Sequence, residues 1–256
     1  MRAHVYSTEG ITLRRMDFGE ADRILTVLTP FLGKVRLIAK GVRRPTSRMA
    51  GHVELFSHAQ LQAARGRDLD VLTQASTIEP FRSVRENMVK AAHGFQLVEL
   101  ADGFMQDGDA HPAVFRLLLA GLGALAGDEY PAPFVARWYE IQLLAEVGYR
   151  PDLASCVRCR ATIAAAVNGY SVMLGGALCP ACAALVPDGL FVGADAMKLL
   201  RFLQRTAHAQ LHPIAVPEPV FAEAEQVLRR HIEFALERRL RSSDFVRQVS
   251  QLQAGV

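Results

Sequence analysis

The sequence has no long uninterrupted run of apolar residues. Half of its 256 residues are hydrophobic, but the longest apolar candidate, residues 113–126, is interrupted by Arg116. A membrane-spanning helix needs about 20 consecutive apolar residues. The opening MRAHVYSTEG also lacks the apolar centre of a signal peptide. We therefore expect a cytoplasmic protein that has no membrane partner.

Acidic residues are missing from a long stretch near the N-terminus. No Asp or Glu lies between Asp22 and Glu54, although seven lysines and arginines do. Residues 1–80 hold 12 basic and 8 acidic residues, a net charge of +4, whereas the remainder holds 17 and 18, a net charge of −1. A block of one sign predicts a surface that binds a polyanion. A solvated loop with surplus charge is the alternative.

Catalytic motifs are missing as well. No GxxxxGK[ST] loop occurs in the sequence, which argues against an ATP-driven motor. His208 and His212 have the spacing of metal ligands on a helix, but they lack the glutamate of an HExxH motif. We expect a protein that is not an enzyme and has no catalytic residue. A metal-dependent nuclease, which needs clustered carboxylates to hold Mg²⁺, is the enzymatic alternative.

The first 80 residues have the pattern of a small β-barrel. The short β-branched segments ILTVLT (24–29) and KVRLIA (34–39) flank a loop that contains Gly33, which predicts a hairpin. Other strand-like segments are GITLRRM, ELFSHAQLQAA and DLDVLTQASTI. About five short strands in such a length are typical of the five-stranded oligonucleotide-binding (OB) barrel. We predict an N-terminal OB-fold β-barrel.

Beyond Phe81 the apolar residues recur at helical spacing. Segments 81–98 and 134–148 have this period, as do ADAMKLLRFLQRTAH and PVFAEAEQVLRRHIEFALERRLR (219–241). Trp138 lies on an apolar helix face, so we expect it in the core. We predict an α+β multidomain protein in which a C-terminal α-helical domain carries an inserted module. The expected segments are the OB domain (1–80), the helical domain (81–150 and 191–256) and the module (151–190).

All four cysteines lie in that module. Cys156 and Cys159 form one CxxC pair, and Cys179 and Cys182 form a second pair after 19 intervening residues. Two such pairs supply four thiolates that close tetrahedrally around a structural Zn²⁺, with no position left for catalysis. Between them GYSVMLGGAL (169–178) predicts a small hairpin. Disulfides between these cysteines are not expected, because the cytosol is reducing. An iron–sulfur cluster and a redox dithiol are the alternatives to zinc.

Three segments resemble the RecO family of bacterial recombination mediators and DNA repair proteins, and the likeness spans nearly the whole chain. They are GITLRRMDFGEADRILTVLTPFLGKVRLIAKGVRRPTSR, LLAEVGYRPDLASCVRC and LCPAC. The most specific parts are GK followed by AKGVRR and a nearby SR, and GYRPDL leading into the first CxxC pair.

The resemblance implies an OB fold that binds single- and double-stranded DNA and anneals complementary strands. It implies help in loading RecA onto DNA covered by single-strand-binding protein, and hence a nucleoid-associated location. It also implies two partners, RecR and the acidic C-terminal tail of single-strand-binding protein. Some relatives lack the cysteines, so zinc is not required for the shared activity.

The basic block supplies the predicted DNA-binding residues. They are Lys34, Arg36, Lys40, Arg43, Arg44 and Arg48, with Arg23 and Arg14 as extensions. Phosphates held along such a groove release condensed counterions, and Arg additionally clamps phosphate oxygens in bidentate fashion. We expect Pro45 to end the strand and to keep the following loop extended. Phe18, Phe31 and Phe56 are candidates for stacking on bases or for filling the barrel.

The helix expected over 219–241 is a candidate for binding the acidic tail. Its basic residues Arg229, Arg230, Arg238 and Arg239 would border an apolar groove, unless this is an ordinary core helix with a charged outer face.

Two non-enzymatic alternatives stay open from the sequence. A zinc-containing transcriptional regulator would need a base-reading helix-turn-helix, and none is evident. An RNA-binding OB-fold protein is the other, because RNA and DNA are both bound through phosphates and stacking.

Overall fold

The computed structural model describes residues 4–212 and 214–254. They form two compact units. The first unit comprises the chain up to Asp128 and from Arg241 onward, and the second comprises Glu129–Leu240. No helix in the described ranges is both long enough and apolar enough to cross a membrane. The four segments expected from the sequence are finer than these two units and stay a prediction.

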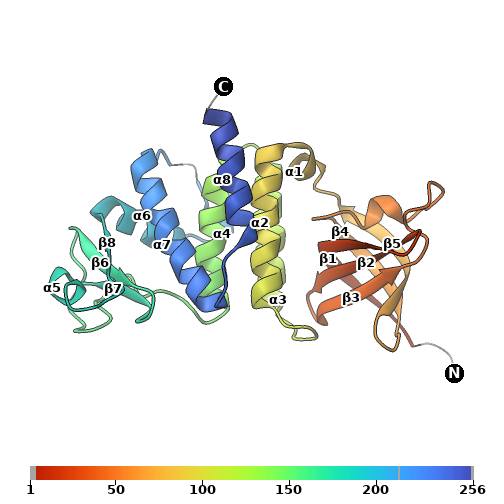
Figure 1. The fold of residues 1–256 in the computed structure, drawn as a ribbon, viewed down its shortest axis with the longest axis horizontal. Helices are drawn as coiled ribbons and strands as arrows, with labels where there is room; N and C mark the ends of the chain where they lie inside the picture. Colours follow the sequence, from red (N-terminus) through yellow and green to blue (C-terminus); the bar gives the residue numbers. More distant parts are fainter. Residues whose placement is uncertain (1–3, 213, 255–256) are drawn as a thin grey trace. The chain divides into compact units, whose positions relative to one another are not determined.

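The N-terminal part of the first unit is a closed five-stranded barrel, as predicted (Figure 1). Its strands are β1 (Val5–Phe18), β2 (Asp22–Thr29), β3 (Gly33–Ala39), β4 (His58–Ala64) and β5 (Asp70–Glu79). The strand order is β1-β2-β3-β5-β4, and β1 also pairs with β4. The pairs are antiparallel except β3 with β5, which is parallel. Together with its closure, this order is that of an OB barrel.

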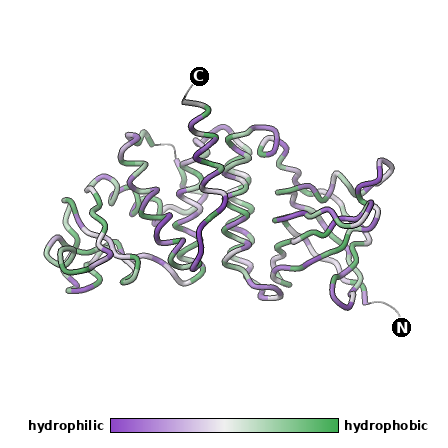
Figure 2. The backbone as a smooth tube through the Cα atoms, viewed as in Figure 1, coloured by the Kyte–Doolittle hydropathy of each residue, from purple (hydrophilic) through white to green (hydrophobic). Residues whose placement is uncertain are grey.

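Apolar side chains that alternate along the strands fill the interior of the barrel. Leu25 and Val27 of β2 and Leu37 of β3 are almost fully buried in one apolar cluster with residues of β4 and β5. The hydropathy of the residues that alternate along the strands can be followed in Figure 2. Two residues outside the strands, Val42 and Val53, join the same cluster. The chain between β3 and β4, which includes the short 3-10 helix η1 (Ala50–His52), is therefore attached to the core at both ends.

Four helices complete the first unit. They are α1 (Arg82–Glu86), α2 (Met88–Phe104), α3 (Pro112–Ala126) and α8 (Arg241–Ala254). The side chain of Asn87 caps α2 by accepting hydrogen bonds from the N–H groups of Val89 and Lys90. The carboxylate of Glu99 on α2 accepts from the N–H groups of Arg241 and Ser242, which begins α8 beside α2 (Figure 1). A contact between helices distant in sequence thus caps the last helix.

The second unit combines helices with a small sheet. Its elements are α4 (Ala132–Glu146), β6 (Asn168–Ser171), β7 (Gly176–Leu178), α5 (Pro180–Ala183), β8 (Leu190–Val192), α6 (Ala194–Arg205), η2 (His208–Gln210) and α7 (Glu218–Leu236). Trp138 of α4 is buried, and its indole N–H donates to the carbonyl of Thr206 at 2.9 Å. This is the core position expected from the sequence. The three-stranded sheet β7-β6-β8 contains the predicted hairpin, which turns at Gly175.

Helix α7 is shorter than the sequence pattern indicates. The pattern continues to Arg241, but α7 ends at Leu236 because Glu237 adopts a left-handed backbone conformation, with φ of 53°. The chain then begins the separate helix α8 at Arg241. Arg238 and Arg239 therefore do not lie on α7, and the expectation of one basic helix face with Arg229 and Arg230 was wrong.

We expect Gly33→Ala to destabilise the first unit. Gly33 has φ of +65°, and a Cβ atom there would lie 2.4 Å from the backbone carbonyl oxygen of Asp109. The strained conformation and this overlap should lower the free energy of unfolding by more than about 2 kcal/mol, measured by urea denaturation. Gly123→Ala is the matched control, because its Cβ would meet open space on α3. The control should gain about 0.5–1 kcal/mol, and equal stability of the two variants would contradict the assignment.

Candidate nucleic-acid interface and metal centre

The strand register places several of the predicted cations on one outward face of the barrel. Cα partners across β1, β2 and β3 form rows, and Arg14, Thr26 and Arg36 are in one row. The next row contains Arg15, Leu25 and Leu37, and the row after that contains Met16, Ile24 and Ile38. Successive side chains alternate between the two sides of a strand, so every second residue shares this face. We call it the outer face, defined by Arg14, Met16, Phe18, Ile24, Thr26, Lys34, Arg36 and Ile38.

The outer face carries exposed apolar side chains beside its cations. Met16 and Phe18 are 56% and 50% exposed at the far end of β1. Phe31, in the turn between β2 and β3, is 73% exposed. Phe56, by contrast, is buried and packs edge-on against Phe95 of α2. Of the three predicted stacking candidates, the structure therefore exposes two and places the third in the core.

The chain after β3 forms consecutive turns. Gly41 has a left-handed backbone, and its N–H donates to Asp22 Oδ1 at 2.7 Å. The N–H of Arg44 donates to the carbonyl of Gly41, and that of Ser47 donates to the carbonyl of Arg44. The extended loop expected after Pro45 is therefore wrong, because these local hydrogen bonds fold the chain back. The turns project Arg44 and Arg48 into solvent beyond the buried Val42.

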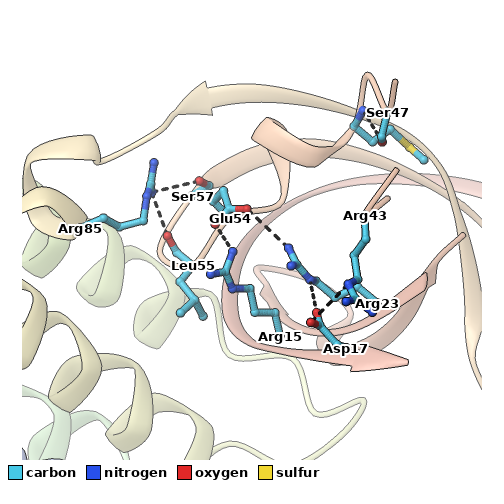
Figure 3. Close-up of polar contacts among 10 residues, drawn as sticks. Arg15, Asp17, Arg23, Arg43, Ser47, Glu54, Leu55, Ser57 and Arg85 are labelled. Carbon is cyan, nitrogen blue, oxygen red and sulfur yellow. Dashed lines mark hydrogen bonds and ion pairs between the residues drawn. The ribbon is translucent and has the colours of Figure 1, made fainter. Parts of the chain in front are cut away.

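Ion pairs engage several of the predicted cations at one rim of the barrel (Figure 3). Asp17 binds both Arg23, at 3.0 Å, and Arg43, at 3.3 Å. Glu54 binds Arg23, at 3.5 Å, and also Arg15. The hydrogen bond from Arg23 holds the pKa of Asp17 below its usual range. The result is a chain of alternating charges whose cations are already partly neutralised.

Lys34 and Arg14 bind a carboxylate of the helical part of the first unit. The ammonium of Lys34 lies 3.0 Å from Asp102 Oδ1 and donates to the Asp102 carbonyl at 2.9 Å. Arg14 Nε lies 3.1 Å from Asp102 Oδ2. The side chain of Lys34 is only 12% exposed, whereas that of Arg14 is 64% exposed. Lys34 therefore attaches β3 to α2, and its charge is largely compensated.

Four of the eight predicted cations, Arg36, Lys40, Arg44 and Arg48, remain exposed without a carboxylate partner within the described ranges. The loop between β4 and β5 adds two arginines that the sequence-based site left out. Arg65 stacks over the ring of Tyr6 and pairs with Asp70 at 3.1 Å, while Arg67 is exposed. Arg36 and Arg65 line the same hollow of about 430 Å³. In the sequence, the RGR motif at 65–67, between two strand-like segments, was the feature that could have indicated these two arginines.

The four cysteine sulfurs converge in the second unit. Those of Cys156, Cys159, Cys179 and Cys182 all lie within 4.8 Å of one another. Each pair lies in a tight turn, in which the N–H of Arg160 donates to the carbonyl of Cys156 and that of Cys182 donates to the carbonyl of Cys179. The cluster is compatible with a metal site, and four soft thiolates are the donor set that zinc prefers in structural sites.

Burial and local hydrogen bonds give the thiols of Cys156 and Cys182 different pKa values. Burial raises the pKa of Cys156, but backbone N–H groups of Cys159, Cys179 and Arg158 outweigh it and lower the pKa to about 6. Burial and the three neighbouring thiols raise the pKa of Cys182 to about 12. Burial is the largest cause of the raised pKa of Cys182, and the charge of Cys156 adds to it. A bound divalent cation would stabilise the thiolate form of each ligand.

Sequence comparisons identify the family. The profile described as "Recombination protein O N terminal" matches residues 1–81, and "Recombination protein O C terminal" matches residues 85–244. A protein of Roseiflexus sp. (strain RS-1) named "DNA repair protein RecO" is 39% identical over 98% of this chain and 88% of its own. Proteins of the same name are 35% identical in Dehalococcoides mccartyi (strain BAV1), over 93% of each chain, and 36% identical in Nocardioides sp. (strain JS614), over 94% of this chain and 99% of its own. The chain therefore belongs to the RecO family.

Proposed function

We propose that this protein is a DNA repair and recombination mediator that binds single- and double-stranded DNA and anneals complementary strands. It works in the cytoplasm on the nucleoid, and it helps to load RecA onto DNA covered by single-strand-binding protein, together with RecR. The single observation that carries the proposal is the outer face. On this face Arg36, which has no carboxylate partner among the described residues, accompanies the exposed side chains of Met16 and Phe18, and the exposed Lys40, Arg44 and Arg48 follow in the turns after β3. OB barrels use this kind of face for oligonucleotides.

DNA binding is proposed to rest on phosphate contacts. Arg36, Lys40, Arg44 and Arg48 have charges that no carboxylate among the described residues compensates, so they gain most from binding a phosphate. Arg14, Arg23, Arg43 and Lys34 must first give up or share an ion pair with Asp17, Glu54 or Asp102. The first group is therefore assigned most of the affinity. Phe18 and Phe31 supply sequence-tolerant stacking.

Annealing of this kind requires no covalent chemistry, and the proposal assigns no catalytic residue. Cations that hold two strands by their backbones reduce the repulsion between them and leave the base edges free to pair. Because affinity comes from released counterions, it should depend weakly on sequence and steeply on salt.

A groove in the second unit supports binding of the acidic tail of single-strand-binding protein. It has a volume of about 360 Å³ and lies between α6 and α7, lined by apolar residues that include Leu199, Phe202 and Val220. Lys198 at its edge is mostly exposed, although it pairs with Asp195 at 2.9 Å. An acidic peptide with an apolar end fits an apolar groove with a cation at its edge. This groove replaces the basic α7 face expected from the sequence.

The cysteine cluster is proposed to hold a structural Zn²⁺. When bound, the ion supplies folding energy to the module. Cys159 and Cys179, whose sulfurs lie 3.7 Å apart, belong to different CxxC pairs, so a shared ion would join the two turns.

Charge reversal at the exposed arginines of β3 and of the turns after it should weaken single-strand binding at the barrel. We expect Arg36→Glu/Arg44→Glu to weaken binding of a fluorescent single-stranded oligonucleotide at least tenfold, and to flatten the slope of log K against log salt by about 0.7 per lost phosphate contact. Annealing of complementary strands should slow in parallel.

The matched control is Arg116→Glu/Arg230→Glu, which makes the same charge change at two exposed positions on α3 and α7. If both double variants lost the same affinity for the oligonucleotide, net charge and not the position of the arginines would explain the effect. A wild-type protein that neither binds nor anneals at low salt would refute the proposed function itself.

Loss of one cysteine should release the metal and loosen the module. We expect native mass spectrometry to find one zinc ion on the wild-type chain and none on Cys182→Ser. Hydrogen exchange should rise in 152–192 and stay unchanged in β1 to β5, because these strands belong to the other unit. Met173→Ser is the control, since it changes an exposed side chain of the same module. A fully zinc-loaded Cys182→Ser protein would contradict the assignment.

A further inference from the structure

Three arginines line one pocket beside the cysteine module. The pocket has a volume of about 310 Å³ and lies between 150–154, which leads into the first CxxC pair, and helix α6. Arg150 comes from the first segment, and Arg201 and Arg205 come from α6. Pro151, Asp152, Leu153, Ala154 and Gln204 complete the lining. We call it the arginine pocket.

Arg201 is held in place by two backbone carbonyls, and no acid among the residues that the structure describes lies within ion-pair distance of it. Its Nε donates to the carbonyl of Leu153 at 2.8 Å, and its Nη2 donates to that of Ile163 at 3.4 Å. A guanidinium has five N–H groups, so these two bonds leave donors for a ligand. The side chain is partly buried, which strengthens its attraction for an anion. Arg201 is thus a positioned cation whose charge its own contacts do not neutralise.

The other two arginines add charge without compensation. Arg150 and Arg205 are exposed, and neither has a carboxylate within ion-pair distance in the part of the chain that the structure describes. This contrasts with Arg23, Arg43 and Arg137, each of which pairs with one or two acids. Three like charges around one hollow repel each other, and an anion placed there relieves that repulsion.

Asp152 is the single carboxylate that lines the pocket, and its oxygens already bind groups of the cysteine module. Asp152 accepts hydrogen bonds from the N–H groups of Ala154 and Ser155 and from the Ser155 hydroxyl. Its Oδ2 also lies 3.8 Å from Arg160 Nη1. Burial raises the pKa of Asp152, but these hydrogen bonds outweigh it and keep the pKa below its usual value. Asp152 therefore shapes the turn before Cys156, while the pocket keeps an excess of positive charge.

We propose that the arginine pocket binds backbone phosphates of a nucleic acid strand, as a second site separate from the outer face of the barrel. Arg side chains clamp phosphate oxygens in bidentate fashion. The lining is mostly polar, whereas a peptide terminus would need apolar surface for its side chain, which the groove between α6 and α7 offers instead. This inference rests on the proposed function, because an annealing protein must hold two strands at once.

The test counts bound strands on the full-length, zinc-loaded protein. A fluorescent oligonucleotide of about six nucleotides is short enough to occupy one OB-type site. We expect the wild type to bind two per chain. Arg150→Glu/Arg205→Glu should bind one with the affinity of the barrel site, and Arg36→Glu/Arg44→Glu should bind one with that of the pocket. Arg201 is left intact, because it also supports the module.

The outcomes separate this inference from the proposed function. Arg116→Glu/Arg230→Glu carries the same charge change and should still bind two strands, with the zinc content of each variant checked by mass spectrometry. One strand per wild-type chain, unchanged in Arg150→Glu/Arg205→Glu, would overturn the second site and leave the function standing. No binding to the wild type would remove both. Two strands retained by Arg150→Glu/Arg205→Glu, with loss of a labelled acidic peptide, would assign the pocket to a peptide and overturn the proposal.

Discussion

Strand β1 is the constraint on which the rest of the first unit depends. Its first half pairs with β4 and its second half pairs with β2, so one strand of 14 residues closes the barrel. The register shifts between Thr12 and Arg14, which inserts Leu13 as an extra residue. Such a bulge bends the strand and moves every later side chain to the other side. Without it Met16 and Phe18 would point into the barrel, and the outer face would lose its apolar surface.

Acids from elsewhere in the chain decide which cations are available. The sequence between Asp22 and Glu54 contains no acid, and from this we predicted a surface that binds a polyanion. Nothing in the sequence indicated that Asp17, Glu54 and Asp102 would pair with four of the eight predicted DNA-binding residues. Those ion pairs depend on strand register and on the position of α2. A run of like charge therefore locates a surface, whereas tertiary ion pairs select the residues that can exchange a counterion for a phosphate.

Local chemistry explains what was predicted and what was not. The barrel hairpin and the cysteine cluster follow from neighbouring residues, such as the turn at Gly33 and the two CxxC pairs. The end of α7 at Glu237 could not be predicted in this way, because no neighbouring residue indicates that a glutamate within a helical pattern adopts a left-handed backbone conformation. Phe56 is buried through contact with α2, and the arginine pocket joins Arg150 to residues about 50 positions later. Both need the tertiary fold.

Dividing the cations between two units would suit the proposed annealing function, because a protein that pairs two strands must then release the duplex. Each phosphate contact adds to affinity through released counterions, so a single continuous site of many arginines would hold a duplex tightly. In the proposed function, two smaller sites, the outer face and the arginine pocket, would share that charge, and each would bind a strand more weakly. Once the strands have paired, the spacing of phosphates is that of the duplex and no longer that of two independent chains. Under this proposal one site would release before the other, and the salt-sensitive contacts that brought the strands together would also let the duplex leave.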